Sequence, residues 1–105
     1  MSNSNLNTKI NNKERIKSIY NYTDKEYELY NIVKNNLNTD KGYEAYYNLY
    51  KLIYDNTKNK DINERRKIIT HKIINLSMDF DWDNKLSNAF DKLAIKDNRQ
   101  DLLVW

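Results

Sequence analysis

The scarcity of two residue types constrains this fold most. In 105 residues the chain contains no proline and a single glycine, Gly42. Proline interrupts helices, while glycine supplies the positive φ angles used by tight turns, β-bulges and phosphate-binding loops. A chain with so little of either does not favour an all-β fold or a glycine-rich phosphate site. We therefore expect an all-α fold in which short loops rich in Asn and Asp connect the helices.

Apolar residues recur at spacings of three and four along four successive segments, which is the pattern of amphipathic helices. The predicted helices cover residues 12–37, 40–57, 61–77 and 82–95. Thr39 or Asp40 is the expected N-cap of the second helix, and Asp61 and Asp81 are those of the third and fourth. The second helix is apolar around most of its circumference, so we predict that it is the most buried.

The first of these segments has two interpretations. Thr23 and Glu26 form the S/T-x-x-E capping box, which would begin a new helix at Asp24. The apolar stripe nevertheless runs through Thr23 without a change of phase. We therefore prefer one long helix to a short helix followed by a longer one.

The chain divides into three parts. Residues 1–11 are polar and rich in Asn and Ser, and we predict a disordered N-terminal tail. Because the predicted connections are short, residues 12–96 are expected to form an antiparallel up-down-up-down four-helix bundle. Residues 97–105 form a C-terminal tail that ends in the apolar sequence Leu-Leu-Val-Trp.

Composition limits the location and the chemistry. The chain has no cysteine, which excludes disulfides and thiolate metal sites. No apolar run approaches the roughly 20 residues of a membrane span, and the N-terminus lacks the apolar core of a signal peptide. We expect a protein that stays in the cytoplasm where it is made. The net charge of +3 is mild for a nucleic-acid-binding protein.

Neither catalysis nor metal binding has a convincing motif. His71 is the only histidine, and zinc requires several His, Cys or acidic ligands, so we expect a helix-surface residue. Residues 79–83 read D-x-D-x-D, like the opening of an EF-hand loop. That loop requires Gly at its sixth position and Glu at its twelfth, where this chain has Asn84 and Phe90. We predict no enzyme activity, metal or cofactor.

The C-terminal half holds the candidate binding residues. The segment 58–72 contains six basic and two acidic residues, which form either a solvated face or a patch for anionic lipid headgroups or an acidic partner. The terminal apolar residues either fold back on the bundle or form an exposed anchor. The candidate binding residues are Arg65, Arg66, Lys67, Leu102, Leu103, Val104 and Trp105.

Two segments resemble a known family. The sequence NERRKIITHKI, residues 63–73, resembles the third helix of some immunity proteins of pediocin-like (class IIa) bacteriocins, and DKLA, residues 91–94, resembles the end of their fourth helix. The resemblance covers about residues 14–95, although the link between helices three and four is shorter here.

The resemblance implies a cytoplasmic protein at the inner face of the membrane that protects the producer cell. Proteins of this family act on the mannose phosphotransferase permease that carries the bacteriocin, and their C-terminal half selects the bacteriocin. Recognition would then involve helices three and four and the C-terminal residues 102–105.

Two other functions remain open. The chain could be a small phage or mobile-element inhibitor of the anti-CRISPR kind, which would bind nucleic acid through the basic third helix and through tyrosines of residues 40–57. The core spacing of these tyrosines favours packing instead. Alternatively, the chain is a helical subunit of a larger assembly, with its apolar end at an interface.

Overall fold

The computed structural model describes the backbone of residues 4–103 and the side chains of residues 12–103. Within this part the chain is helical and contains no strand, which confirms the all-α prediction. The elements are α1 (Ser4–Tyr20), α2 (Asp24–Asn35), α3 (Asp40–Asn56), α4 (Ile62–Ile69), the π-helix η1 (Thr70–Ile74), α5 (Asn75–Asp79), α6 (Leu86–Lys96) and the 3₁₀-helix η2 (Gln100–Leu103). Because α4, η1 and α5 follow one another without a break, we call residues 62–79 the α4–α5 helix.

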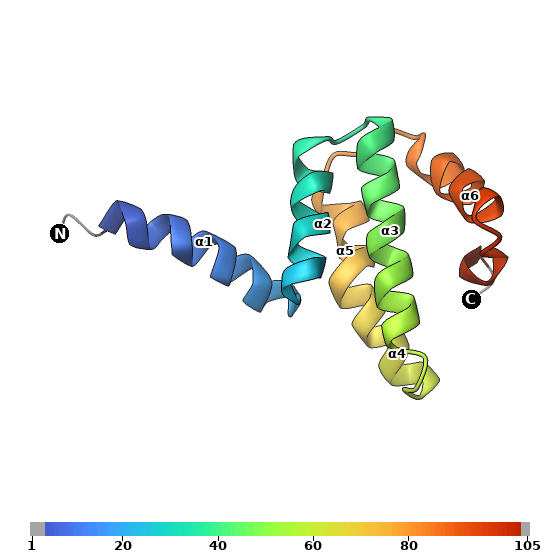
Figure 1. Ribbon diagram of the computed structural model, residues 1–105, viewed down its shortest axis with the longest axis horizontal. Coiled ribbons are helices and arrows are strands. Elements are labelled where there is room, and N and C mark those ends of the chain that lie inside the picture. Colours follow the sequence, from blue (N-terminus) through green and yellow to red (C-terminus); the bar gives the residue numbers. More distant parts are fainter. Residues whose placement is uncertain (1–3, 104–105) are drawn as a thin grey trace.

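Helix α3 is the centre of the molecule. Figure 1 shows α2 and the α4–α5 helix beside it, α6 on its other side, and α1 extending away from the rest. Nine residues of α3 are buried, more than in any other described helix, which confirms the prediction for this segment. The apolar residues that surround α3 form one core with it.

The most deeply buried part of the core lies between α3, α2 and the α4–α5 helix. The largest fully buried side chains are Val33, Leu49, Ile53, Ile69, Ile73 and Leu76. All are aliphatic, so they fill the space between the helices by shape alone. None of them belongs to α6.

The predicted caps of α3 and α4 are confirmed. The Thr39 side chain accepts a hydrogen bond from the backbone N–H of Gly42, and the Asp61 side chain accepts one from the N–H of Glu64. These contacts satisfy N–H groups that have no partner inside the first helical turn. Short-range sequence signals therefore located both helix starts.

The preference for one long helix over residues 12–37 was wrong. Helix α1 ends at Tyr20, Asn21 has a φ of 58°, and α2 begins at Asp24. Thr23 Oγ1 accepts from the N–H of Glu26, whose carboxylate accepts from the N–H of Thr23 (3.2 and 2.8 Å). This reciprocal capping box provides hydrogen-bond partners for backbone N–H groups at the start of α2. It is a local effect that the apolar periodicity does not detect.

The N-terminal segment also differs from the prediction. Residues 4–11, predicted as a disordered tail, belong to α1, while residues 1–3 lie outside the described part. Neither proline nor glycine occurs in α1 to interrupt it. Its last turn is attached to the α4–α5 helix, where Tyr20 donates a hydrogen bond to Asp79 (2.7 Å).

The predicted start of the fourth helix at Asp81 was also wrong. Helix α6 begins at Leu86, and its N-cap residue, Lys85, makes no side-chain capping bond. The preceding residues have partners elsewhere, because Trp82 Nε1 donates to the carbonyl of Leu76 (3.0 Å) and the Asp83 carboxylate accepts from Tyr43 (2.8 Å). These contacts hold the segment in an irregular connection instead of a first helical turn.

Candidate binding groove

Two hollows beside α3 share Tyr50 in their lining. The first hollow, of about 260 Å³, is lined by Tyr46, Tyr50, Ser77, Leu86, Ser87, Phe90 and Asp91. The second hollow, also of about 260 Å³, is lined by Tyr50, Arg66, Ile69, Thr70 and Ile74. Because the two hollows share Tyr50, we treat them as one site and call it the aromatic groove. Helix α3 contributes to both hollows, α6 lines most of the first, and the α4–α5 helix lines most of the second.

Aromatic rings form the floor of the aromatic groove. The Phe90 ring meets Tyr50 and Tyr46 edge to face, with centroids 5.0 and 6.2 Å apart, and Tyr50 stacks on Tyr54 at 6.4 Å. Such pairs hold large apolar rings in fixed positions. Burial raises the pKa of Tyr46 to about 12, so its hydroxyl stays protonated at neutral pH.

The walls of the groove are more exposed than its floor. Tyr46 and Tyr50 are only 6% and 7% exposed, whereas Ile74 on the α4–α5 helix is 36% exposed. Met78, one turn beyond Ile74, is 79% exposed. Exposed aliphatic side chains beside an aromatic floor are typical of a surface that another apolar group covers.

The two hollows carry opposite charges. The first contains the carboxylate of Asp91, and the second contains the guanidinium of Arg66. Both residues lie on the exposed surface. The linings of the two hollows therefore include charges of opposite sign.

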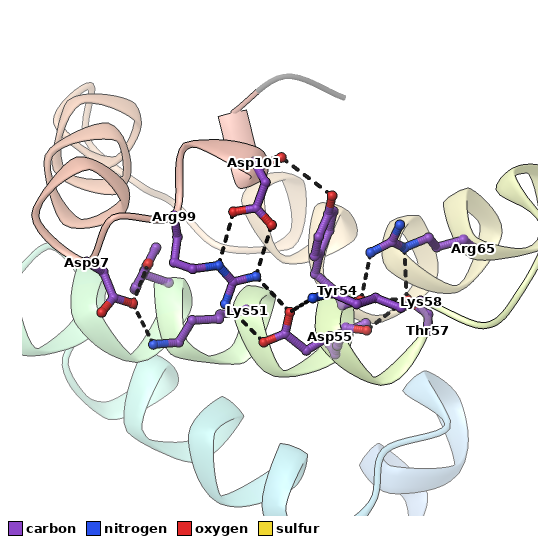
Figure 2. A network of polar contacts seen from close by, with 11 residues as sticks. Lys51, Tyr54, Asp55, Thr57, Lys58, Arg65, Asp97, Arg99 and Asp101 are labelled. Carbon is purple, nitrogen blue, oxygen red and sulfur yellow. Dashed lines mark hydrogen bonds and ion pairs between the residues drawn. The ribbon is translucent and has the colours of Figure 1, made fainter.

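A polar network fixes the C-terminal part of the chain against α3 (Figure 2). The Arg99 guanidinium donates two hydrogen bonds to Asp55 (2.7 and 3.0 Å) and two to Asp101 (3.0 and 3.1 Å). Arg99 holds the pKa values of both carboxyl groups below their usual range. Both residues are therefore charged partners of Arg99 at neutral pH, and η2 is held beside α3.

The end of α6 is held in a similar way. The Asp97 carboxylate accepts hydrogen bonds from Lys51 (2.7 Å) and Tyr47 (2.8 Å), both on α3. These two donors lower the pKa of Asp97. Polar contacts at the edge thus position α6, whose residues line the first hollow of the aromatic groove.

The basic candidates of the third helix occupy three different environments. Arg65 is half-buried, with its guanidinium 3.8 Å from the Tyr54 ring centroid and hydrogen bonds to the Tyr54 carbonyl (2.9 Å) and to Thr57 Oγ1 (3.3 Å). It therefore joins α4 to the C-terminus of α3. Arg66 lines the second hollow of the groove, and Lys67 is exposed without lining either hollow.

The C-terminal candidates divide between core and surface. Leu102 is 3% exposed and belongs to the core, whereas Leu103 is 37% exposed. The tail is thus docked at Leu102 and open to solvent at Leu103. Val104 and Trp105 lie outside the described residues.

The residues that form the groove carry no motif in the sequence. The core spacing of the tyrosines in residues 40–57 favoured packing, and Tyr46 and Tyr50 do pack in the core. That spacing did not predict that α6 leaves a hollow above them. The signal that the sequence did offer is the number of directions in which the tyrosines of α3 point. They cover more of the helix circumference than one neighbouring helix buries.

The acidic and histidine motifs have structural partners. His71 is exposed, and its Nε2 donates to the carbonyl of Ile19 (2.6 Å). Asp79 and Asp83 each accept a hydrogen bond from a tyrosine of another helix. Among the residues that the structure describes, no group of three or more His, Cys, Asp or Glu side chains is arranged to hold a metal ion.

In the described part of the chain, no helix combines the length and the apolar character needed to span a membrane. Comparison with models of protein families, with curated proteins and with solved structures finds no match to this chain.

Proposed function

We propose that this chain is a non-enzymatic binding protein whose aromatic groove holds an apolar segment of a partner protein, and that it serves as a bacteriocin immunity protein. One observation carries the binding function: two hollows share Tyr50 in their lining, the first is lined by aromatic rings, and the second is lined by the exposed aliphatic residue Ile74. Aromatic rings held in place by packing lose little freedom when a ligand covers them, so they suit the centre of a binding surface.

The immunity role is supported by where the family resemblance falls. Residues 63–73 and 91–94 lie on the α4–α5 helix and on α6, which are the two walls of the groove. We take α2, α3, the α4–α5 helix and α6 as the four antiparallel helices of an up-down-up-down bundle, with α1 as an addition. Recognition would involve the groove together with the C-terminal residues.

The proposed partner is a membrane permease of the mannose phosphotransferase type with bound bacteriocin, reached from the cytoplasmic face. Protection follows from differential binding. A protein that binds the bacteriocin-bound permease better than the free one accumulates on it and blocks leakage through the pore. This role needs neither catalysis nor a cofactor.

The nucleic-acid alternative is less well supported by the site. The tyrosines that would stack bases are packed in the core, and Arg65 contacts Tyr54 and Thr57 of its own chain. The assembly alternative loses one of its apolar end residues, because Leu102 is buried in the core of the same chain, while Leu103 is exposed.

Expression in a bacterium sensitive to pediocin-like peptides tests the proposal. Cells would carry the wild-type chain, Ile74→Asp in the groove, or Ile95→Asp as a matched control. Ile95 is an exposed isoleucine of α6 that lines neither hollow. We expect protection from the wild type and the control, and its loss with Ile74→Asp. Absence of protection against every peptide of the class would contradict the immunity role, and protection by Ile74→Asp would place recognition outside the groove.

A further inference from the structure

The first hollow of the aromatic groove has the size of a site for one side chain. Its volume is about 260 Å³, whereas pockets for drug-sized ligands occupy roughly 300–1,000 Å³. Besides Tyr50, its lining consists of the apolar groups of Tyr46, Leu86 and Phe90 and the oxygen-bearing side chains of Ser77, Ser87 and Asp91. Among the described residues that line this hollow, none is cationic, so the lining has a net negative charge.

Helix α6 supplies two adjacent rows of this lining. Leu86 and Phe90 are four residues apart, as are Ser87 and Asp91, so the members of each pair are neighbours on one face of the helix. Leu86 and Phe90 are half-buried, whereas Ser87 and Asp91 are exposed. The lining therefore changes from apolar on its buried side to polar on its exposed side.

The carboxylate of Asp91 differs from that of Asp97 at the end of the same helix. Asp97 accepts hydrogen bonds from Lys51 and Tyr47, whereas Asp91 makes no hydrogen bond or ion pair through its side chain within the described part of the chain. Also in the lining, the Ser77 hydroxyl donates its proton to the carbonyl of Ile74 (2.6 Å), so its oxygen can only accept further hydrogen bonds. The hollow thus offers a negative charge and a hydroxyl oxygen to a donor.

These features favour a basic side chain over the other classes. Lysine and arginine combine an aliphatic stem with a charged end that only donates hydrogen bonds. The stem matches Leu86 and Phe90, and the charged end matches Asp91. An acidic side chain would be repelled by Asp91. A purely apolar one that covered the carboxylate would remove water from it without replacing the lost hydrogen bonds.

We infer, on the basis of the proposed function, that the first hollow holds one lysine or arginine side chain of the partner protein. Its aliphatic stem packs against Leu86 and Phe90, and its ammonium or guanidinium group pairs with Asp91. The partner segment that the aromatic groove holds therefore carries a basic residue among its apolar ones.

Single amino-acid derivatives provide the probe. The N-acetyl methylamides of lysine and arginine carry the basic side chains, that of citrulline is a neutral analogue of arginine, and that of glutamate is acidic. Each is titrated into the isotope-labelled full chain and followed by NMR. We expect the basic derivatives to shift the signals of residues that line the first hollow and to bind about fivefold more tightly than the citrulline derivative. The difference should shrink at high salt, because exposed charges are screened. The glutamate derivative should not bind.

Asp91→Asn tests the carboxylate, and Asp81→Asn is the matched control. Both aspartates are exposed, but Asp81 lines neither hollow. Asp91→Asn should bind the arginine and citrulline derivatives equally, whereas Asp81→Asn should behave as the wild type. Circular dichroism should show the same helical content in all three chains. Equal weakening by both substitutions would overturn the inference. Signal changes of the same size at exposed carboxylates throughout the chain would also overturn it, because they would show only a general attraction of cations.

Protection in cells separates this inference from the immunity role. Where the wild-type chain protects, cells with Asp91→Asn should be inhibited at about fivefold lower peptide concentrations, and cells with Asp81→Asn should match the wild type. Full protection by Asp91→Asn would overturn the assignment of a basic side chain of the partner to the hollow and leave the immunity role intact. Binding of the basic derivatives at the hollow without protection by the wild-type chain would contradict the immunity role alone.

Discussion

The two sides of α3 are built differently. Toward α2 and the α4–α5 helix, Leu49 and Ile53 are 0% and 1% exposed and meet other aliphatic side chains. Toward α6, tyrosines pack against Phe90, and hydrogen bonds such as that from Tyr47 to Asp97 hold the edges. Fully buried aliphatic side chains fill the centre of the first interface, whereas rings with polar tips line the first hollow beside the second. The first side therefore governs stability, and the second is available for binding.

The largest expected effect comes from shortening a side chain on the closed side. Leu49→Ala should lower the free energy of unfolding by about 3–5 kcal/mol, because it leaves a cavity among fully buried neighbours. Leu86→Ala on the groove wall is the matched control and should cost about 1–2 kcal/mol, because Leu86 is only half-buried. Urea denaturation measures both values. Equal losses would remove the distinction between the two sides.

A buried ion pair is the next most important contact of the closed side. Lys72 contacts Glu26 at 2.8 Å, and their side chains are 14% and 3% exposed. Glu26→Gln should lower the free energy of unfolding by about 2–3 kcal/mol, because the charge of Lys72 loses its partner. The exposed pair of Lys25 and Glu28 provides the control. Glu28→Gln should change the free energy of unfolding by less than about 0.5 kcal/mol. A Glu26→Gln variant as stable as this control would show that the pair contributes little.

The α6 side should respond less to the loss of its central cation. Arg99→Gln removes the charged hydrogen bonds to Asp55 and Asp101, which lie near the surface. We expect a loss of about 1 kcal/mol in the free energy of unfolding, smaller at high salt because exposed charges are screened. Thermal unfolding at low and high salt checks this expectation. A loss as large as that from Leu49→Ala would mean that this network, and not the aliphatic core, dominates stability.

Lowering the pH should weaken the attachment of α6 and η2 to α3 before it destabilises α3 itself. Hydrogen bonds from cations lower the pKa values of Asp55, Asp97 and Asp101 in the folded chain. Their stabilising effect is therefore complete above the unfolded value of about 4 and is lost as the pH falls through the lower folded values. Amide hydrogen exchange should show protection falling in α6 and η2 before it falls in α3. Simultaneous loss in all three elements would contradict a separate, carboxylate-dependent attachment of α6.

The sequence predicts those features of the fold that depend on residues close to one another along the chain. The caps at Thr39 and Asp61 and the burial of α3 are local or periodic properties, and the structure confirms them. The break at Thr23 was visible as a capping box, but periodicity was given more weight. The start of α6 was not predictable in this way, because Trp82 and Asp83 bind residues of other elements.

The groove was beyond sequence reasoning for a related reason. The pattern identifies Tyr46, Tyr50 and Phe90 as inward-facing residues, but a hollow depends on how closely two helices approach. That distance is set by contacts far apart in the sequence, such as Lys51 with Asp97 and Asp55 with Arg99. Residues 63–73 were expected to form a recognition surface, yet Arg65 of this segment packs on Tyr54, and of its basic residues only Arg66 lines the groove.

Site-specific photocrosslinking in cells exposed to a pediocin-like peptide tests the central claim most directly. The crosslinker replaces Ser87, which lines the groove, or Asn63, an exposed residue of α4 that does not. We predict a covalent adduct with the permease from Ser87 only, formed only when the peptide is present. An adduct from Asn63 alone, or none from Ser87 in protected cells, would contradict binding through the groove.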